Sequence, residues 1–199
     1  MMALSWRLAM KLVLKITAAL VIGTLLGLFL TFITVVRPLI PSGISNGPWR
    51  TSLSNGDAAG DPYTRARVAL HGPLARNRRE TIYFTATRDS DGDRLDGRCI
   101  YEISGRDPDA RWWSITAYGP DEHLIPNPAN RYSVSKTTIS HDANGDFTVR
   151  VGGTEAGANW IPLVPGHISP NLRLYNPGPL VSLDPVHTSL PTITRVTCP

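Results

Sequence analysis

An apolar stretch near the N-terminus constrains this chain more than any other feature. It reads "ITAALVIGTLLGLFLTFITVV" from Ile16 to Val36 and contains no charged residue. A helix of this length spans about 31 Å, close to the hydrocarbon thickness of a bilayer, and satisfies its own backbone hydrogen bonds as lipid requires. We therefore predict a transmembrane helix over residues 16–36. Leu12–Leu14 would extend it if Lys11 and Lys15 snorkel to the interface.

A cleaved signal peptide is the alternative interpretation. Its apolar region is shorter, about 7–15 residues, and ends in small residues at the cleavage site. This stretch ends in "TVVRPLIP", which lacks that pattern, so an uncleaved signal anchor is favoured. The flanking basic residues are Arg7, Lys11 and Lys15 before the span and Arg37 after it. The positive-inside rule then keeps residues 1–15 in the cytoplasm and exports the rest, which in a bacterium means across the inner membrane into the periplasm.

The positive net charge comes from this N-terminal part. The chain has 20 basic and 16 acidic residues, a formal net charge of +4. Residues 1–37 contain these four basic residues and no acidic one. Residues 38–199 therefore contain 16 basic and 16 acidic residues and carry no net charge. A nucleic-acid-binding domain normally carries a basic face of its own. We therefore expect the membrane, and no nucleic acid, among the partners.

Cys99 and Cys198 are the only cysteines, and both follow the predicted span. An oxidising compartment favours one disulfide between them. Such a bond closes a loop of about 100 residues and stabilises by up to about 4.7 kcal/mol in the chain-entropy model. Strand alternation places Cys99 on a face with Ile103, and Cys198 on a face with Val196, so both thiols should point toward apolar side chains. Two buried free thiols or one reactive thiol are the alternatives.

Composition divides the exported part into a linker and a domain. Residues 37–60 are rich in Pro, Gly, Ser and Asn, which predicts a membrane-proximal linker that settles onto the domain through Trp49. Asp61 as N-cap and Gly72-Pro73 as a stop predict one short helix. Residues 61–199 then form the periplasmic domain.

After residue 80 the apolar period changes to two, which is typical of half-buried strands. The segments are "ETIYFTATR", "RCIYEI", "RWWSITAY", "DFTVRVG", "NLRLY" and "TITRV", separated by clusters of Gly, Pro, Asn and Asp. Short strands with frequent turns and no βαβ alternation predict a mainly β domain, an antiparallel β-sandwich of jelly-roll-like type. In "RWWSITAY" the alternation places Trp113 on one face and Trp112 on the other.

The stretch "TRDSDGDRLDGRCIY" (residues 87–101) concentrates aspartate and glycine, and it reads either as a calcium loop or as a turn. With Asp89 as the first ligand of an EF-hand loop, the sixth position is Arg94 instead of glycine. The twelfth is Ile100 instead of glutamate. Asp91-Gly92 instead favours a tight hairpin turn. We therefore predict a β-hairpin with exposed aspartates and no metal site.

The candidate ligand-binding residues lie in and after "RWWSITAY". An outward-facing Trp112 is suited to stacking on sugars or aromatic ligands, and the following loops supply hydrogen-bonding groups. The candidate set is Trp112, Asp121, His123, Asn127, Asn130, Arg131 and Tyr132. Alternatively, the asparagines shape Pro-rich turns and Arg131 pairs with an acid.

Motifs of established catalytic chemistry are missing from the sequence. It contains no nucleophile elbow, phosphate loop, dinucleotide fingerprint or His/Cys spacing typical of a metal site. No catalytic residue, metal or cofactor is therefore predicted, and the interpretation leans away from an enzyme.

These segments together resemble the family catalogued as domain of unknown function 1214. The matching pieces are "DPYTRARVA", "YFTATRDSDGDRLDG", "RWWSITAY", "IPNPANRYS", "NWIPL" and "LRLYNP", which occur in the family's order. The resemblance implies a β-rich, jelly-roll-like domain of bacterial envelopes, without an established reaction. Longer relatives carry a second uncharacterised domain, catalogued as 1254, where this chain has its apolar stretch.

The leading functional hypothesis is a non-enzymatic binding or accessory module for an envelope glycan or envelope protein. One alternative is an envelope hydrolase or modifying enzyme with a site built from loops around Asp121, His123 and Arg131. A second alternative is a structural subunit of an envelope assembly, which should expose a large apolar patch.

Overall fold

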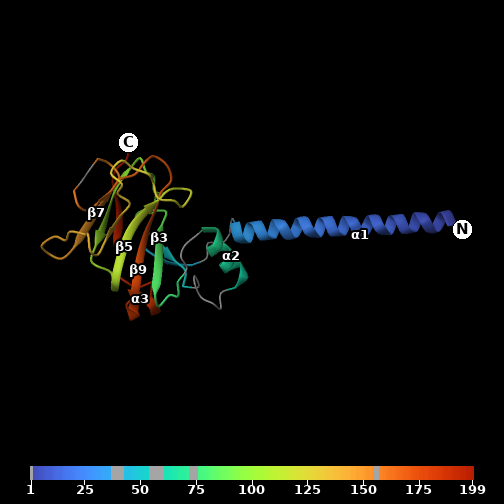
Figure 1. Cartoon of the computed structure of the whole chain (residues 1–199), viewed down its shortest axis with the longest axis horizontal. Helices are drawn as coiled ribbons and strands as arrows, with labels where there is room; N and C mark the ends of the chain where they lie inside the picture. The colour runs from blue at the N-terminus through green and yellow to red at the C-terminus, as the bar shows by residue number, and fades with distance from the viewer. Residues whose placement is uncertain (1, 37–42, 54–60, 72–75, 155–156) are drawn as a thin grey trace.

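The computed structural model describes residues 2–36, 43–53, 61–71, 76–154 and 157–199. Figure 1 shows a β-sandwich from which one long N-terminal helix projects. The mainly β, two-sheet sandwich predicted from the alternating segments is confirmed.

Helix α1 (Met2–Thr31) continues into a π-helical turn, η1 (Phe32–Val36). The segment Ala9–Val36 comprises 28 residues with a mean hydropathy of 2.5. Most of its large apolar side chains are exposed, with Leu20 at 67% and Leu25 at 61%, whereas Val35 near its end is buried. This N-terminal helix is therefore long and apolar enough to span a membrane.

The larger sheet contains six strands whose neighbours are all antiparallel, in the order β1-β2-β3-β9-β5-β6. They are β1 (Ile44–Asn46), β2 (Trp49–Thr51), β3 (Thr81–Ala86), β5 (Ala110–Tyr118), β6 (Ser133–Ser135) and β9 (Ser169–Pro177). Strand β9 lies between β3 and β5, so the chain returns to the centre of this sheet after building most of the other one.

The smaller sheet contains four strands in the order β10-β4-β7-β8. They are β4 (Ile100–Gly105), β7 (Phe147–Val151), β8 (Trp160–Ile161) and β10 (Thr192–Thr197). Among the described strands only β7 and β8 are parallel neighbours. Strand β8 has two residues, too few to produce an alternation in the sequence.

The core lies between the two sheets. The six-stranded sheet contributes alternate residues of its central strands, and the four-stranded sheet contributes those of β4, β7 and β10. Trp113 is fully buried and stacks on Phe147 of the opposite sheet, with ring centres 4.9 Å apart and planes inclined by 28°. Strand alternation therefore decides which side chains hold the layers together.

Part of the segment interpreted as a linker belongs to the larger sheet. Strands β1 and β2 pair with each other, and β2 pairs with β3. Trp49 is fully buried, as contact with the domain requires, and its Nε1 donates to the carbonyl of Pro191 at 2.6 Å. Nδ2 of Asn46 donates to two carbonyls of the same segment, those of Pro185 and Thr188. Residues 37–42 and 54–60 of the linker lie outside the described residues.

Helix α2 (Pro62–His71) begins at the predicted cap. The Asp61 carboxylate accepts hydrogen bonds from the Thr64 hydroxyl at 2.6 Å and from the N–H groups of Tyr63 and Thr64 at 2.9 and 3.1 Å. The hydroxyl contact is the main cause that lowers the pKa of Asp61. The stop signal Gly72-Pro73 lies outside the described residues. The prediction of one short helix misses α3 (Pro179–Leu183), whose five residues make little more than one turn.

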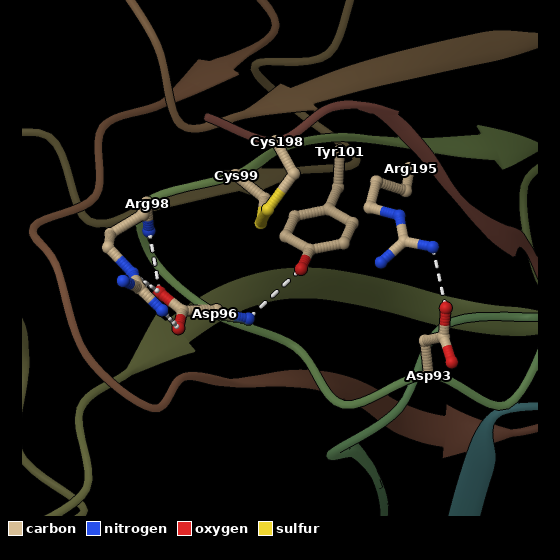
Figure 2. Close-up of a disulfide and its surroundings, with 7 residues drawn as sticks. All are labelled: Asp93, Asp96, Arg98, Cys99, Tyr101, Arg195 and Cys198. Atoms are coloured by element: carbon tan, nitrogen blue, oxygen red, sulfur yellow. Dashed lines mark hydrogen bonds and ion pairs between the residues drawn. A yellow bond between two sulfur atoms is a disulfide. The ribbon is translucent and has the colours of Figure 1, made fainter.

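Cys99 and Cys198 form a disulfide, with their Cα atoms 4.2 Å apart (Figure 2). Cys99 is buried on the core face, as predicted. The prediction that Cys198 shares an apolar face with Val196 is wrong, because Val196 is 49% exposed. The register of β10 against β4 shifts between Arg195 and Thr197, which ends the simple alternation there.

The acidic stretch contains the predicted tight turn but does not join two paired strands. The N–H of Asp89 donates to the carbonyl of Asp93 at 2.8 Å, and Gly92 has a φ of 93°. Strand β3 before the turn belongs to the larger sheet and β4 after it to the smaller one. The prediction of a simple hairpin is therefore corrected: Asp-Gly chemistry specifies the turn locally, whereas distant strands decide the pairing.

Candidate functional site

The central strands of the larger sheet present a second face that is turned away from the core. Residues that alternate with the core positions on β3, β5 and β9 project from it. We call this the outer face. Its residues are Thr81, Tyr83, Thr85, Trp112, Ser114, Thr116, Tyr118, Asn171, Arg173 and Tyr175.

The strand register arranges these residues in rows across β3, β9 and β5. The rows are Thr81–Tyr175–Trp112, Tyr83–Arg173–Ser114 and Thr85–Asn171–Thr116. Side chains directly opposite each other on one face of an antiparallel pair lie within contact distance. Arg173 therefore lies in the middle row, with Tyr83 of β3 on one side and Ser114 of β5 on the other.

Arg173 is held by two tyrosines. Its guanidinium carbon lies 5.8 Å from the centre of the Tyr83 ring and 5.4 Å from that of Tyr118. Its Nη2 donates a hydrogen bond to the Tyr118 hydroxyl. A guanidinium stays charged in proteins and interacts favourably with the faces of aromatic rings. The tyrosines thus position a permanent positive charge on the outer face.

Trp112 and Tyr175 form an aromatic pair at one end of the rows. Their ring centres are 5.2 Å apart and the planes are inclined by 64°, an edge-to-face contact. Both side chains are half-buried. This geometry leaves part of each aromatic surface accessible, as stacking on a ligand requires.

Several polar atoms of the outer face are buried without a hydrogen-bond partner. They are Thr81 Oγ1, Asn171 Oδ1 and Arg173 Nε. The amide of Asn171 donates to the hydroxyl of Thr85 at 2.8 Å, which fixes its orientation. Buried polar groups normally have partners because leaving them unpaired costs free energy. Among the described residues Thr51 Oγ1, Asp89 Oδ2, Trp113 Nε1 and Arg150 Nε are in the same situation, so such atoms are not specific to the outer face.

Burial raises the pKa of Tyr83, with a further contribution from the neighbouring Tyr175, while Arg173 opposes the rise. The Tyr83 phenol is therefore neutral at physiological pH and keeps its hydroxyl proton. The outer face combines one fixed cation with neutral hydroxyl and amide groups.

The structure places the sequence-predicted residues in different surroundings. Trp112 lies on the outer face. The side chains of Asp121 and His123 are 71% and 83% exposed. Asp121 Oδ1 accepts from the N–H of His123 at 3.1 Å, and His123 Nδ1 lies 2.7 Å from the Asp121 carbonyl oxygen. These two residues contact mainly their own loop.

The remaining predicted residues shape the turn before β6. Nδ2 of Asn127 donates to the carbonyls of Ile125 and Arg131, and its Oδ1 accepts from the Arg131 N–H at 3.0 Å. Asn130 has a φ of 50°, and its side-chain oxygen accepts from the Tyr132 hydroxyl at 3.4 Å.

The guanidinium of Arg131 donates to the carbonyls of Gly157 and Ala158. The alternative in which this arginine pairs with an acid is therefore replaced by pairing with backbone oxygens. These contacts support a turn-building role for the set without testing ligand binding.

The outer-face residues beyond Trp112 were not candidates in the sequence. Arg173 stands between two leucines in "NLRLY", a charged residue inside an apolar strand. That position is the one feature of the sequence that points to the outer face. An arginine in an apolar strand must either pair with another group or lie on a face that is open to solvent. Its grouping with Tyr83 and Tyr118 requires knowledge that β9 lies between β3 and β5.

The acidic turns use their carboxylates to support the backbone. In "DSDGD" (89–93) the Oδ1 of Asp89 accepts from the N–H of Asp93 at 2.8 Å. In "DANGD" (142–146) the Oδ1 of Asp142 accepts from the N–H of Asp146 at 2.9 Å. Asp89 is buried, contrary to the expectation of exposed aspartates, and its Oδ2 lacks a partner. Within the described ranges no group of three or more His, Cys, Asp or Glu residues is arranged to hold a metal.

Comparisons with solved structures show a shared fold. The VPA0106 protein from Vibrio parahaemolyticus aligns with a TM-score of 0.57 and 24% identity, over 70% of this chain and 36% of that one. A putative uncharacterized protein from Burkholderia cenocepacia aligns with a TM-score of 0.43 and 16% identity, over 83% and 38% of the two chains. The second score is too low to support an argument. This chain thus spans much less than the full length of either protein.

No curated protein matches the chain. Residues 80–179 match the family described as Protein of unknown function (DUF1214). This segment contains every residue of the outer face as well as the acidic stretch at residues 87–101. Because the match covers half of the sequence, the chain belongs to the DUF1214 family.

Proposed function

We propose that this chain is a membrane-anchored binding module whose outer face recognises a glycan of the bacterial cell envelope. The observation that carries the proposal is the grouping of Trp112, Tyr175, Arg173 and Asn171 on adjacent strands. Aromatic rings stack on the apolar faces of sugars, while guanidinium and amide groups bind hydroxyls.

The composition of the outer face favours binding over catalysis. As defined above, its residues include no Asp, Glu or His. Glycoside hydrolysis usually needs a pair of carboxylates, and general acid–base catalysis most often uses histidine or a carboxylate. A non-enzymatic role is therefore the simplest one for this face.

Three features support placement in the envelope. Helix α1 exposes apolar side chains along its length, and these need a lipid environment or a partner. The three basic residues before Ile16, against the single Arg37 directly after Val36, favour a cytoplasmic N-terminus and a periplasmic sandwich. The Cys99–Cys198 disulfide suits that oxidising compartment.

Glycan recognition can be tested with the full-length protein in nanodiscs of zwitterionic lipid, applied to an array of bacterial envelope glycans. We expect binding to a restricted glycan set. The Trp112→Ala variant should bind about tenfold more weakly or worse, as for a buried aromatic anchor. Trp6→Ala is the matched control, because Trp6 lies in α1 and is 72% exposed. Absence of glycan binding by the wild type would refute the proposal.

Orientation can be tested independently of the ligand. A reporter enzyme that becomes active only in an oxidising compartment should be active when fused after Pro199. The same reporter should be inactive when fused before Met1 of the full-length chain. The reverse pattern would place the sandwich in the cytoplasm and contradict the envelope role.

A further inference from the structure

The outer face carries an uncompensated charge. On β3, β5, β6 and β9, Arg173 is the only outward-facing residue that is charged at neutral pH. On the neighbouring β2, Arg50 is exposed opposite Thr85 and adds a second positive charge at the edge of this face. Its described contacts are the two tyrosine rings and the Tyr118 hydroxyl, none of which is an anion. Charged side chains are almost never fully buried unless they are paired. The structure therefore maintains a cation without a counter-ion where the proposed ligand binds.

The surroundings of Arg173 leave donors for that ligand. A guanidinium has five N–H donors, and the contact with Tyr118 uses one on Nη2. Nε is enclosed and lacks a partner, so the donors that remain for a ligand are on the terminal nitrogens. Two tyrosine rings fix the guanidinium plane, which reduces the entropy lost when an oxyanion binds.

A neutral sugar and an acidic sugar would use this site differently. A neutral sugar hydroxyl leaves the charge of Arg173 without a counter-ion after the ligand excludes water. A carboxylate or phosphate oxygen compensates the charge, and charge-assisted hydrogen bonds are about twice as strong as neutral ones.

We propose that the outer face selects an acidic saccharide, and that Arg173 binds the oxyanion of its uronate or sugar phosphate. This inference rests on the proposed glycan-binding function and specifies its ligand class. Trp112 and Tyr175, in the adjacent row, bind the apolar face of a neighbouring sugar unit. Selectivity for acidic over neutral glycans then depends mainly on Arg173.

The test uses the full-length protein in nanodiscs of zwitterionic lipid and isothermal titration calorimetry. The probes are an oligogalacturonate, its methyl ester, which is neutral and nearly isosteric, and an oligosaccharide that bears mannose 6-phosphate. We expect the wild type to bind one of the two acidic probes at least about tenfold more tightly than the ester. The acid that binds better identifies the oxyanion as carboxylate or phosphate.

Variants identify the residue that reads the charge. Arg173→Gln should reduce the affinity for the acid to that for the ester while leaving the ester unchanged. Arg173→Lys keeps the charge but loses the planar geometry, and should retain part of the preference. Trp112→Ala should weaken acidic and neutral probes alike. Near-ultraviolet circular dichroism checks that each variant is folded.

Salt dependence provides a test that needs no variant. Raising the salt concentration from about 0.05 to 0.5 M should weaken wild-type binding of the acid and spare that of the ester. Equal affinities for acid and ester, insensitive to salt, overturn the inference but leave glycan binding intact. If the protein binds a neutral glycan of the array but neither acidic probe, the inference is likewise overturned and glycan binding stands. Failure of every glycan to bind overturns both proposals.

Discussion

Trp112 and Trp113 are adjacent in the sequence but have opposite surroundings. Trp113 is fully buried and stacks on Phe147 of the other sheet. Trp112 is half-buried and meets Tyr175 of its own sheet edge-on. The inner face therefore connects two layers, whereas the outer face arranges side chains within one layer. If the proposed function holds, this difference separates stability from recognition along a single strand, β5.

The largest expected effect is on the inner face. Trp113→Ala removes a buried aromatic side chain that bridges the sheets and should lower the free energy of unfolding by about 3–5 kcal/mol. Trp112→Ala is the matched change on the other face and should cost clearly less. Chemical denaturation monitored by tyrosine and tryptophan fluorescence measures both. Equal losses would contradict the division between the two faces.

The next largest effect concerns the closure of the core at its edge. Replacing both cysteines, Cys99→Ser with Cys198→Ser, should lower the free energy of unfolding by about 2–4 kcal/mol, because the bond joins residues 99 positions apart. Wild-type protein unfolded with a reductant should show the same loss. Binding by the outer face should survive at temperatures where the variant stays folded. An unchanged midpoint of denaturation would show that the disulfide adds no stability.

Changes around Arg173 should affect stability less. Arg173→Met removes the charge together with the unpaired Nε, so the free energy of unfolding should change by no more than about 1 kcal/mol. Tyr118→Phe keeps the arginine and removes the acceptor of its Nη2, and should cost about 0.5–1.5 kcal/mol. Tyr63→Phe on the exposed part of α2 is a control. A larger loss for Arg173→Met than for Tyr118→Phe would mean that this arginine serves the fold.

The smallest effect lies at the corner between the sheets and depends on pH. Bidentate hydrogen bonds from Arg98, together with its backbone N–H, lower the pKa of Asp96 to about 2 (Figure 2). An unfolded aspartate has a pKa of about 3.9. Because the folded pKa is the lower one, this stabilisation is fully present above about pH 4 and is lost as the pH falls toward about 2.

Asp96→Asn should therefore be less stable than the wild type at pH 5, and the gap should close by about pH 2. Thermal unfolding at several pH values checks this. A gap that persists at pH 2 would contradict the assignment. The comparison of Trp112→Ala with Trp113→Ala, made near neutral pH, should not depend on the protonation of Asp96, since Asp96 belongs to neither sheet face.

The sequence predicts features that depend on local chemistry. Alternation located the strands around Phe84, Trp113 and Val149, and the side chain of Asp61 marked the start of α2. The Asp91-Gly92 turn is local in the same sense, because glycine adopts a positive φ without steric cost. These features succeed because each depends on residues within a few positions of one another.

The outer face, in contrast, brings together residues that are far apart in the sequence. Arg173 meets Tyr83 only because β9 inserts between β3 and β5, and no local pattern encodes that neighbourhood. For the same reason the acidic turn predicted a hairpin, although its flanking strands pair elsewhere. The loop residues around Asn127 are candidates for ligand binding by residue type alone. Their observed contacts instead stabilise a turn. Candidate sites in β-sandwiches therefore require strand order as well as residue type.

The hydrogen bonds that hold β1 and β2 to the domain have a consequence for the folding rate. Asn46 and Trp49 are held by carbonyls 139 to 142 residues further along the chain. Contacts of such high sequence separation raise the contact order, and chains of this kind fold slowly because loop closure precedes any gain in contact energy. The edge formed by β1 and β2 is thus completed only after the segment before β10 is in place. Until then, an unpaired strand edge is available to other chains, which makes folding the step most exposed to aggregation.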